Sequence, residues 1–235
     1  MLRNAQQIYG KKLGASDGGI GQVKDFYVDD RTWTIRYLIA DASSWLADRQ
    51  VLILPKVVRS LDPEHASIPI DLTRKQIEDS PPISLHLPVS RQYEEQYHRY
   101  YGMPYYWEGN GLWNMTGIQL QNLDPQPVPP GAGTAAQNRG DPHLRSMRMM
   151  KGYSIHARDG NIGTLSDFSF DDESWDIVHL TIETGHWYAG KQIYLLPEQV
   201  ERISYGDAAI FVNLSMEDIR STAAHATAVM NSVTG

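Results

Sequence analysis

The sequence predicts a mainly β protein of two tandem small β-barrels, each followed by a short C-terminal helix. The first observation is an internal repeat: Asp17–Gly21 (DGGIG) returns 142 positions later as Asp159–Gly163 (DGNIG), and the two copies align at this offset without a gap. The second is an apolar pattern of period two within each copy, which is typical of half-buried strands. A repeat of this length indicates two copies of one domain and not a solenoid of short units.

A β-hairpin with an acidic turn opens each copy. The first copy turns at Asp29–Thr32 and the second at Asp171–Ser174, where aspartate suits the turn because its side chain accepts hydrogen bonds from nearby backbone amides. The apolar positions that flank the first turn are Ile20, Val23, Phe26, Val28, Trp33, Ile35, Tyr37 and Ile39. We therefore interpret the acidic pairs as turn residues and the nearby glycines as hairpin or bulge positions.

A third and a last strand follow in each copy. Gln50–Pro55 matches Gln192–Pro197, and proline closes both strands because it cannot donate to a ladder. The last strand is expected at Ser67–Ile70 and at Ala209–Val212. About six short strands in a domain of this size favour a small closed or nearly closed barrel.

A helix start signal ends each copy. Thr73 and Gln76 have the spacing of a capping box, in which each side chain bonds the backbone amide of the other residue. Ser215 and Asp218 form a weaker version, because aspartate stands where glutamate or glutamine is usual. Both copies are therefore expected to end in a short helix.

The segment between the copies differs in composition. Pro88–Gly102 predicts a short helix that Ser90 caps and Gly102 ends. Prolines and glycines after Asp124 predict a flexible linker. The predicted division is a first repeat at 1–80, an aromatic-rich helical extension at 81–123, a Pro/Gly/Ala-rich linker at 124–143, a second repeat at 144–222 and a flexible tail at 223–235.

Composition excludes several classes of protein. The 235 residues include no cysteine, so disulfides, zinc–thiolate sites and thiol nucleophiles are ruled out. A net charge of −7 argues against a general nucleic-acid or anionic-membrane surface. No apolar run reaches the ~20 residues of a membrane span, and Met1–Asn4 leads directly into repeat sequence, which leaves no room for a signal peptide. We expect a cytoplasmic protein.

Two stretches of each copy resemble a known family. The run Asp17–Asp30 with Trp33, and the later Val51–Pro55, are similar to the PRC-barrel family, which is named after the cytoplasmic domain of the photosynthetic reaction-centre H subunit. That family also includes the C-terminal domain of a ribosome maturation factor. The segment Arg91–Trp107 is similar to the extension of tandem PRC-barrel proteins of bacteria. The resemblance implies two PRC-barrel folds and binding of other proteins without catalysis.

Aromatic side chains are the strongest candidates for a function. Tyr93, Tyr97 and Tyr100 share one face of the predicted helix, where they either pack on the first barrel or bind a partner. Trp45 and Trp187 occupy equivalent loops, which favours a structural part in each barrel, although exposed tryptophans would anchor an interface. The candidate partner-binding residues are Tyr93, Tyr97, Tyr100, Tyr101, Tyr105, Tyr106, Trp107, Trp45 and Trp187.

A weaker candidate is a metal site. His179, Glu183 and His186 combine imidazole and carboxylate ligands at short spacing. The first copy has tyrosine, aspartate and serine at the equivalent positions, so this set is not a property of the domain. No Gly-x-Ser-x-Gly motif or other nucleophile signature is present, so we expect neither an enzyme nor a bound cofactor.

The preferred function is a non-enzymatic protein-interaction or scaffold module built from two PRC-barrels. One alternative is a relative of the reaction-centre H subunit that modulates electron or proton transfer at a membrane complex, although the chain has no membrane span of its own. Another is a small-molecule or metal-binding protein that uses the cleft between the barrels. The partner is expected to be a protein, and homo-oligomerisation is a further alternative.

Overall fold

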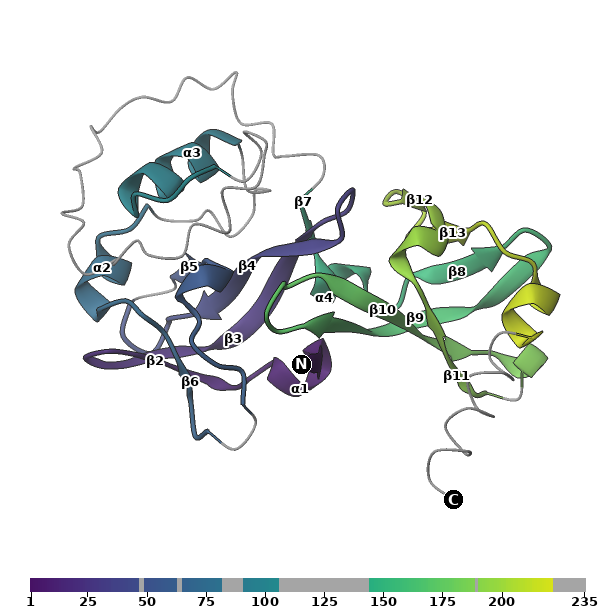
Figure 1. The fold of residues 1–235 in the computed structure, drawn as a ribbon, viewed down its shortest axis with the longest axis horizontal. Coiled ribbons are helices and arrows are strands. Elements are labelled where there is room, and N and C mark those ends of the chain that lie inside the picture. Colours follow the sequence, from purple (N-terminus) through teal and green to yellow (C-terminus); the bar gives the residue numbers. More distant parts are fainter. Residues whose placement is uncertain (47–48, 63–64, 82–90, 106–143, 189, 222–235) are drawn as a thin grey trace. The chain divides into compact units, whose positions relative to one another are not determined.

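The computed structural model describes residues 1–46, 49–62, 65–81, 91–105, 144–188 and 190–221, and it is mainly β, as predicted (Figure 1). The elements up to the segment between the repeats are β1 (Leu2–Asn4), α1 (Ala5–Ile8), β2 (Lys12–Ala15), β3 (Gly18–Asp29), β4 (Thr34–Asp41), β5 (Gln50–Ile53), η1 (Pro55–Val57), β6 (Ile68–Pro69), α2 (Arg74–Glu78) and α3 (Arg91–Tyr100). Those that follow are β7 (Leu144–Ser146), α4 (Met147–Met150), β8 (Ser154–Ala157), β9 (Gly160–Asp171), β10 (Ile177–Thr184), η4 (His186–Tyr188), β11 (Gln192–Leu195), η5 (Pro197–Gln199), β12 (Val200–Ser204) and β13 (Ala209–Val212). Residues 216–221 are helical.

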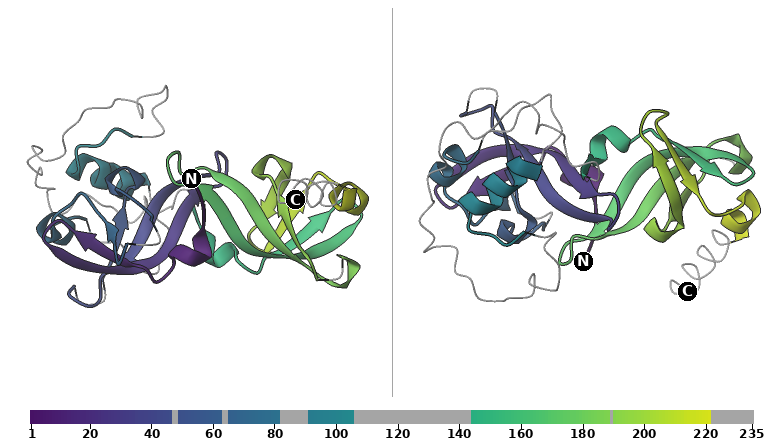
Figure 2. Two further views of the ribbon diagram at one scale, coloured as in Figure 1. Left: turned by 60° about the horizontal axis from the view of Figure 1, so that its bottom comes forward. Right: turned by 90° about the horizontal axis from the view of Figure 1, so that it is seen from above.

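The strands form two mixed sheets, each dominated by one repeat. One has the order β5-β4-β3-β2-β6 with β7 also paired to β3, and the other has the order β11-β10-β9-β8-β13-β12 with β1 also paired to β9. Figure 2 shows the long twisted hairpins β3–β4 and β9–β10, in purple to blue and in green. Each order has two ends, so among the strands that the structure describes neither sheet closes into the predicted barrel. In the first sheet the end strand β6 has only two residues, and its Pro69 has no amide hydrogen with which to extend the ladder.

The compact units of the chain do not follow the predicted domain boundaries. One unit, here called the second-repeat unit, comprises Met1–Tyr9, Val28–Ile35 and Arg145–Gly235. The other, the first-repeat unit, comprises Gly10–Tyr27 and Arg36–Leu144. The N-terminal strand explains the difference, because β1 pairs with β9 of the other repeat, with Arg3 opposite Phe170. The linker at 124–143 and the tail at 223–235 lie outside the described residues.

Both acidic turns have the local structure that the sequence predicts. In the first turn Asp29 Oδ1 accepts the amide of Arg31 at 3.0 Å, and in the second Asp171 Oδ1 accepts that of Glu173 at 2.9 Å. Each turn ends in a tryptophan in the left-handed region, with φ of 55° at Trp33 and 63° at Trp175. The aspartate side chains therefore satisfy backbone donors within their own turns.

The two turns also bond each other in the second-repeat unit. The amide of Ile35 donates to the carbonyl of Trp175 at 2.8 Å, and the amide of Ile177 donates to the carbonyl of Trp33 at 2.7 Å. These two bonds join equivalent positions of the two repeats in opposite directions. The turns are therefore related by an approximate internal twofold.

The glycine at the fifth and last position of the motif is required by close backbone packing. Gly21 has φ of +123°, and a Cβ there would lie 1.9 Å from the carbonyl oxygen of Asp41. Gly163 has φ of +145°, and its Cβ would lie 2.1 Å from the carbonyl oxygen of Glu183. Only glycine meets both demands, since it has no Cβ and adopts positive φ without strain. This is why the motif recurs in both copies.

Capping residues begin both terminal helices as expected. Thr73 Oγ1 accepts the amide of Gln76 at 3.2 Å, and Gln76 Oε1 accepts the amide of Thr73 at 2.9 Å. Ser215 Oγ accepts the amide of Asp218 at 3.1 Å, and Asp218 Oδ2 accepts the amide of Ser215 at 3.0 Å. The shorter aspartate therefore completes the same reciprocal pair as glutamine.

Candidate protein-binding surface

Helix α3 lies on the outer face of strands β4 and β5 in the first-repeat unit (Figure 1). The register places Ile39 opposite Leu52, and Tyr37 shares their face because side chains alternate along a strand. All three are buried, with 0 to 2% of their surface exposed. The helix therefore converts what would be a surface of the sheet into core.

A polar cluster joins the helix to β4. The Tyr37 hydroxyl lies 2.8 Å from Glu94 Oε1 and 3.0 Å from His98 Nε2, while His98 Nδ1 lies 2.9 Å from the carbonyl of Pro104. A carbonyl can only accept, so Nδ1 carries a proton. Glu94 and His98 are both 0% exposed, although ionisable residues are seldom fully buried.

Proton counting shows how this burial is tolerated. Tyr37 has one hydroxyl proton and two polar neighbours, so one of the two neighbours, Glu94 or His98 Nε2, donates a proton to the phenol oxygen. The three side chains carry no net charge in both arrangements, whether as a carboxylate with an imidazolium or as a carboxylic acid with a neutral imidazole. A neutral hydrogen-bonded set is far less costly to bury than an isolated charge.

Three of the predicted interface tyrosines are also buried by the first-repeat unit itself. Tyr97 donates to the carbonyl of Leu52, and Tyr100 donates to the carbonyl of Gln76 at 3.0 Å. Tyr101 donates to the same Gln76 carbonyl at 3.3 Å. Their exposed fractions of 1, 7 and 6% favour the packing alternative over a partner-binding surface. The side chain of Tyr93, and the residues Tyr106 and Trp107, lie outside the described part of the chain.

Tyr105 continues the same packing, with its ring 5.8 Å from that of His98. The aromatic density of this segment therefore reflects the filling of one sheet face. Sequence reasoning missed Glu94 and His98 as part of it. Their signal was the spacing of four residues, which places both on the helical face of Tyr97 and Tyr101.

The two loop tryptophans have matching positions. Trp45 donates its indole N–H to the carbonyl of Ile20 at 3.0 Å, and Trp187 donates to the carbonyl of Ile162. Both are half-buried, and an arginine of the terminal helix covers each ring: Arg74 over Trp45 at 4.4 Å and Arg220 over Trp187 at 5.8 Å. This repetition favours the structural part that the sequence suggested for them.

The equivalent sheet face of the second-repeat unit is different. The register places Thr181 opposite Tyr194, and His179 shares their face, so these residues stand where Ile39, Leu52 and Tyr37 stand in the other repeat. Tyr194 is 56% exposed, whereas Leu52 is 1% exposed. The ring of His179 packs at 5.9 Å from that of Tyr194, and Leu196 is also exposed. Tyr194 is therefore open at a position that the first repeat covers, whereas Thr181 is only 8% exposed and His179 is half-buried.

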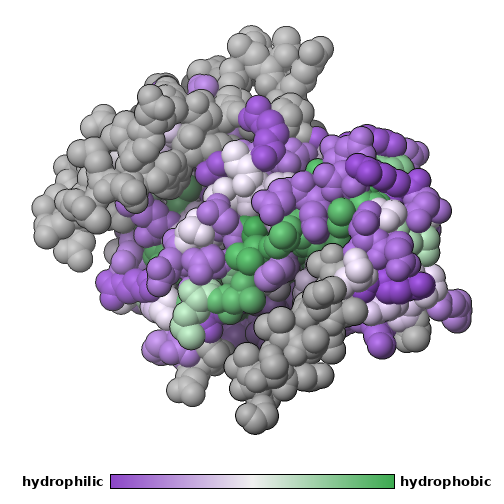
Figure 3. Space-filling model, turned by 45° about the vertical axis from the view of Figure 1, so that its right-hand side comes forward, coloured by the Kyte–Doolittle hydropathy of each residue, from purple (hydrophilic) through white to green (hydrophobic). Residues whose placement is uncertain are grey.

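Leu196 and Tyr194 are among the large apolar or aromatic residues that are exposed in the described part of the chain. Figure 3 shows a face on which hydrophobic residues reach the surface among mainly hydrophilic ones. Within the residues that the structure describes, the exposed large hydrophobic ones are Met1, Leu2, Met149, Tyr194 and Leu196.

The proposed metal ligands do not converge. His179 packs against Tyr194, while Glu183 and His186 are exposed. In the part of the chain that the structure describes, which includes all three, no group of three His, Cys, Asp or Glu side chains is placed to hold a metal ion. The arrangement gives the metal hypothesis no geometric support.

A hollow of about 780 Å³ lies within the first-repeat unit, beside the repeated glycines. Its polar lining includes Lys12, Asp41 and Ser67. Hydrogen bonds from the side chain and backbone of Ser43 hold the pKa of Asp41 below its usual value. Asp41 is therefore already engaged with Ser43 within the lining of this hollow.

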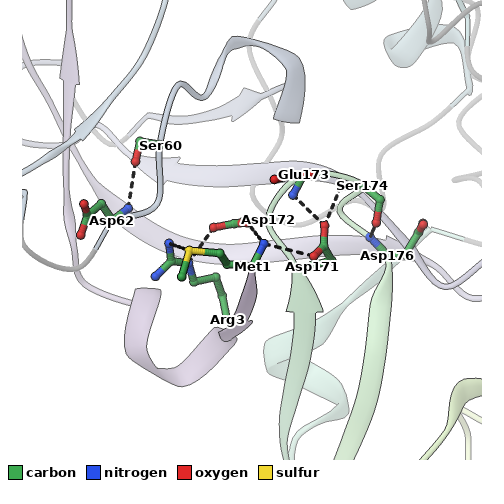
Figure 4. Close-up of polar contacts among 9 residues, drawn as sticks. All are labelled: Met1, Arg3, Ser60, Asp62, Asp171, Asp172, Glu173, Ser174 and Asp176. Carbon is green, nitrogen blue, oxygen red and sulfur yellow. Dashed lines mark hydrogen bonds and ion pairs between the residues drawn. The ribbon is translucent and has the colours of Figure 1, made fainter.

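A further polar cluster ties the N-terminal segment into the second-repeat unit (Figure 4). Arg3 Nε and the α-ammonium group of Met1 both contact Asp172, and the ammonium group also lies 3.2 Å from Asp171 Oδ2. These contacts come from β1 and from the second acidic turn. Their role is structural, since they hold an exchanged strand in place.

In comparisons with known proteins, no family model matches the sequence, and no curated protein matches it. Among the described residues no helix is both long and apolar enough to cross a membrane.

Proposed function

We propose that this chain is a non-enzymatic protein-binding or scaffold module of the cytoplasm, built from two PRC-barrel-like repeats with different roles. The observation that carries the proposal is the exposure of Tyr194 on the β10–β11 face, whose counterpart Leu52 is buried under α3. In this account the first repeat is closed by the chain's own helix. The second repeat supplies the surface that binds the partner.

The chemistry of the open face suits a protein partner. Tyrosine combines a large apolar ring with a hydroxyl that remains hydrated, which is why it is enriched at interfaces. Leu196 adds apolar surface, and His179 adds a group that can donate or accept a hydrogen bond. Exposed apolar and aromatic side chains that gather on one sheet face are typical of interaction sites.

The PRC-barrel assignment rests on the sequence resemblance and on the repetition of elements. Strands β3 and β9 both begin at the equivalent glycine of the motif and both span 12 residues. The turns and helix caps also recur at equivalent positions. The open ends of both sheets are the feature in which the described strands depart from a closed barrel.

The proposal is tested by affinity capture of the intact chain from its native host, at low and at moderate salt. A variant with Tyr194→Ser and Leu196→Ser is compared with a control, Met149→Ser, in which a more exposed apolar residue is removed elsewhere. We expect a partner that survives moderate salt, that the control retains and that the double variant loses. Equal capture by both variants, or recovery of the chain alone, would contradict the proposal.

Thermal melting serves as the control for folding in this comparison. Replacement of exposed residues changes stability little, so both variants should melt close to the unmodified chain. A large drop for the double variant alone would show that Tyr194 and Leu196 are structural. The loss of capture would then carry no information about binding.

A further inference from the structure

The helix α3 shows how a sheet face of this repeat holds a helix. Glu94, Tyr97 and His98 lie on one side of the helix because residues three and four apart are neighbours on its surface. Two of them contact the hydroxyl of Tyr37 on β4, and Tyr97 donates to the backbone carbonyl of Leu52 on β5. The face therefore binds the helix at two points. One is the Tyr37 side chain on β4, and the other is the Leu52 carbonyl on β5, the strand at the end of the sheet.

The second repeat has the same two positions, with Tyr194 exposed and His179 half-buried. Strand β11 stands at the end of its sheet, as β5 does, and Tyr194 pairs with Thr181 as Leu52 pairs with Ile39. The Tyr194 carbonyl therefore corresponds to the acceptor of the Tyr97 hydroxyl. His179 corresponds to Tyr37, the residue that α3 contacts through Glu94.

We propose that the β10–β11 face binds an amphipathic helix of a protein partner, laid across it as α3 lies across β4–β5. This inference rests on the proposed function and adds the chemistry of the partner. The helix presents a carboxylate or a hydroxyl group to His179, and a hydrogen-bond donor three residues further on reaches the Tyr194 carbonyl. Apolar side chains between them cover Tyr194 and Leu196.

Charge on the face adds a second requirement. Glu183 is exposed and shares the alternating face of β10 with His179 and Thr181, so one end of this face is acidic. A matching helix carries lysine or arginine at the end that lies over Glu183. Helix α3 has the same polarity, with Glu94 in its first turn and Arg99 in its last.

The composition of the face also sets the strength of binding. In the first repeat the face contributes Ile39 and Leu52, which are fully covered, whereas the second repeat has Thr181 and Tyr194 there. Thr181 offers less apolar surface than Ile39, so a helix that docks on the second repeat removes less apolar surface from water than α3 does on the first. Its binding is therefore weaker. An exchangeable partner fits this face better than a permanently bound one.

The test places the photo-crosslinking amino acid benzoylphenylalanine at position 194 of the full chain, in extract of the native host, with the same substitution at position 149 as control. We expect cross-links from position 194 alone, to one segment of one partner, with apolar residues at helical spacing and an acidic or hydroxyl side chain among them. Cross-links to residues 222–235, to a second copy of the chain or to a strand or loop of the partner would overturn the inference.

A synthetic peptide of the cross-linked segment then measures the contribution of His179. Loss of one hydrogen bond at an interface weakens binding about tenfold. We expect this loss for His179→Ala and none for Glu201→Ala, which replaces an exposed residue of β12. Equal affinity of the two variants for the peptide would show that His179 does not bond the partner helix. If capture depends on Tyr194 but the cross-linked segment is not helical, the proposed function stands and this inference fails; if capture does not depend on Tyr194, both fail.

Discussion

Arg3 and Asp172 belong to different repeats of the sequence, yet Arg3 Nε lies 2.7 Å from Asp172 Oδ2, with the side chains only 16 and 13% exposed. The equivalent pair occurs in the opposite direction, where Arg145 Nε lies 3.3 Å from Asp30 Oδ2. Each N-terminal strand thus supplies an arginine to the acidic turn of the other repeat. The second-repeat unit is consequently a joint product of both copies.

Removal of the Asp172 charge should destabilise the chain measurably. Asp172→Asn leaves the largely buried Arg3 without its anion, and we expect the free energy of unfolding to fall by about 1–3 kcal/mol. Urea denaturation followed by circular dichroism measures the change. Asp79→Asn, which breaks an exposed pair with Lys75, is the control and should cost less than about 0.5 kcal/mol. Equal effects would show that the Arg3 contact contributes no more than a surface pair.

The glycine motif makes a second prediction. Gly21→Ala would place a Cβ 1.9 Å from the Asp41 carbonyl at a φ of +123°, so the backbone must move. We expect a loss of at least about 3 kcal/mol or failure to fold. Gly19→Ala, two residues away with nothing within 4 Å of its Cβ, should change stability by less than about 1 kcal/mol. Similar melting temperatures for both variants would refute the close approach.

Attachment of α3 depends on the buried cluster. Tyr37→Phe removes the hydroxyl that contacts both Glu94 and His98, which leaves buried polar groups short of a partner. We expect a loss of about 1–3 kcal/mol and faster hydrogen exchange in α3. Glu95→Gln, on the same helix but only half-buried, serves as control and should leave exchange unchanged. Unaltered α3 exchange in Tyr37→Phe would show that the cluster does not hold the helix.

Tyr205 should make folding sensitive to high pH. Burial, together with its hydrogen bond to Asp30, raises the pKa of the Tyr205 phenol. A raised pKa means that its contribution to stability is complete below pH ~10 and is lost as the pH rises toward the folded value. Absorbance at 295 nm should therefore show that Tyr205 ionises well above pH ~10 while the chain remains folded. The difference between the unmodified chain and Tyr205→Phe isolates this group, and a midpoint near 10 would contradict the prediction.

Local features of the fold were predictable because their signals are local. Contacts between neighbours in sequence form the helix cap of Thr73 and Gln76 and the acidic turns. The structural part of Trp45 was predictable for a different reason, because the repeat places Trp187 in the equivalent loop. The exchange of β1 was not predictable, since a three-residue strand with alternating burial does not encode which sheet it joins. Burial of Tyr97 was also undecided, because tyrosine suits both a core and an interface.

The difference between the two sheet faces is visible in the sequence when the two repeats are aligned. Tyr37, Ile39 and Leu52 become His179, Thr181 and Tyr194, whereas the inner positions Leu38 and Ile53 become Leu180 and Leu195. Only the outward positions of alternating strands become more polar. A change restricted to one face indicates that the two copies differ in the use of this face while they keep the same core.

The most direct test of this account is covalent labelling of tyrosines, read by mass spectrometry, in the free chain and in extract of the native host. Tyr194 is 56% exposed and Tyr97 is 1% exposed, so the free chain should be labelled at the first and not at the second. In extract, Tyr194 should become protected while Tyr97 remains unlabelled. Unchanged labelling of Tyr194 in extract, or labelling of Tyr97 in the free chain, would contradict the assignment of β10–β11 as the binding face and of β4–β5 as the covered one.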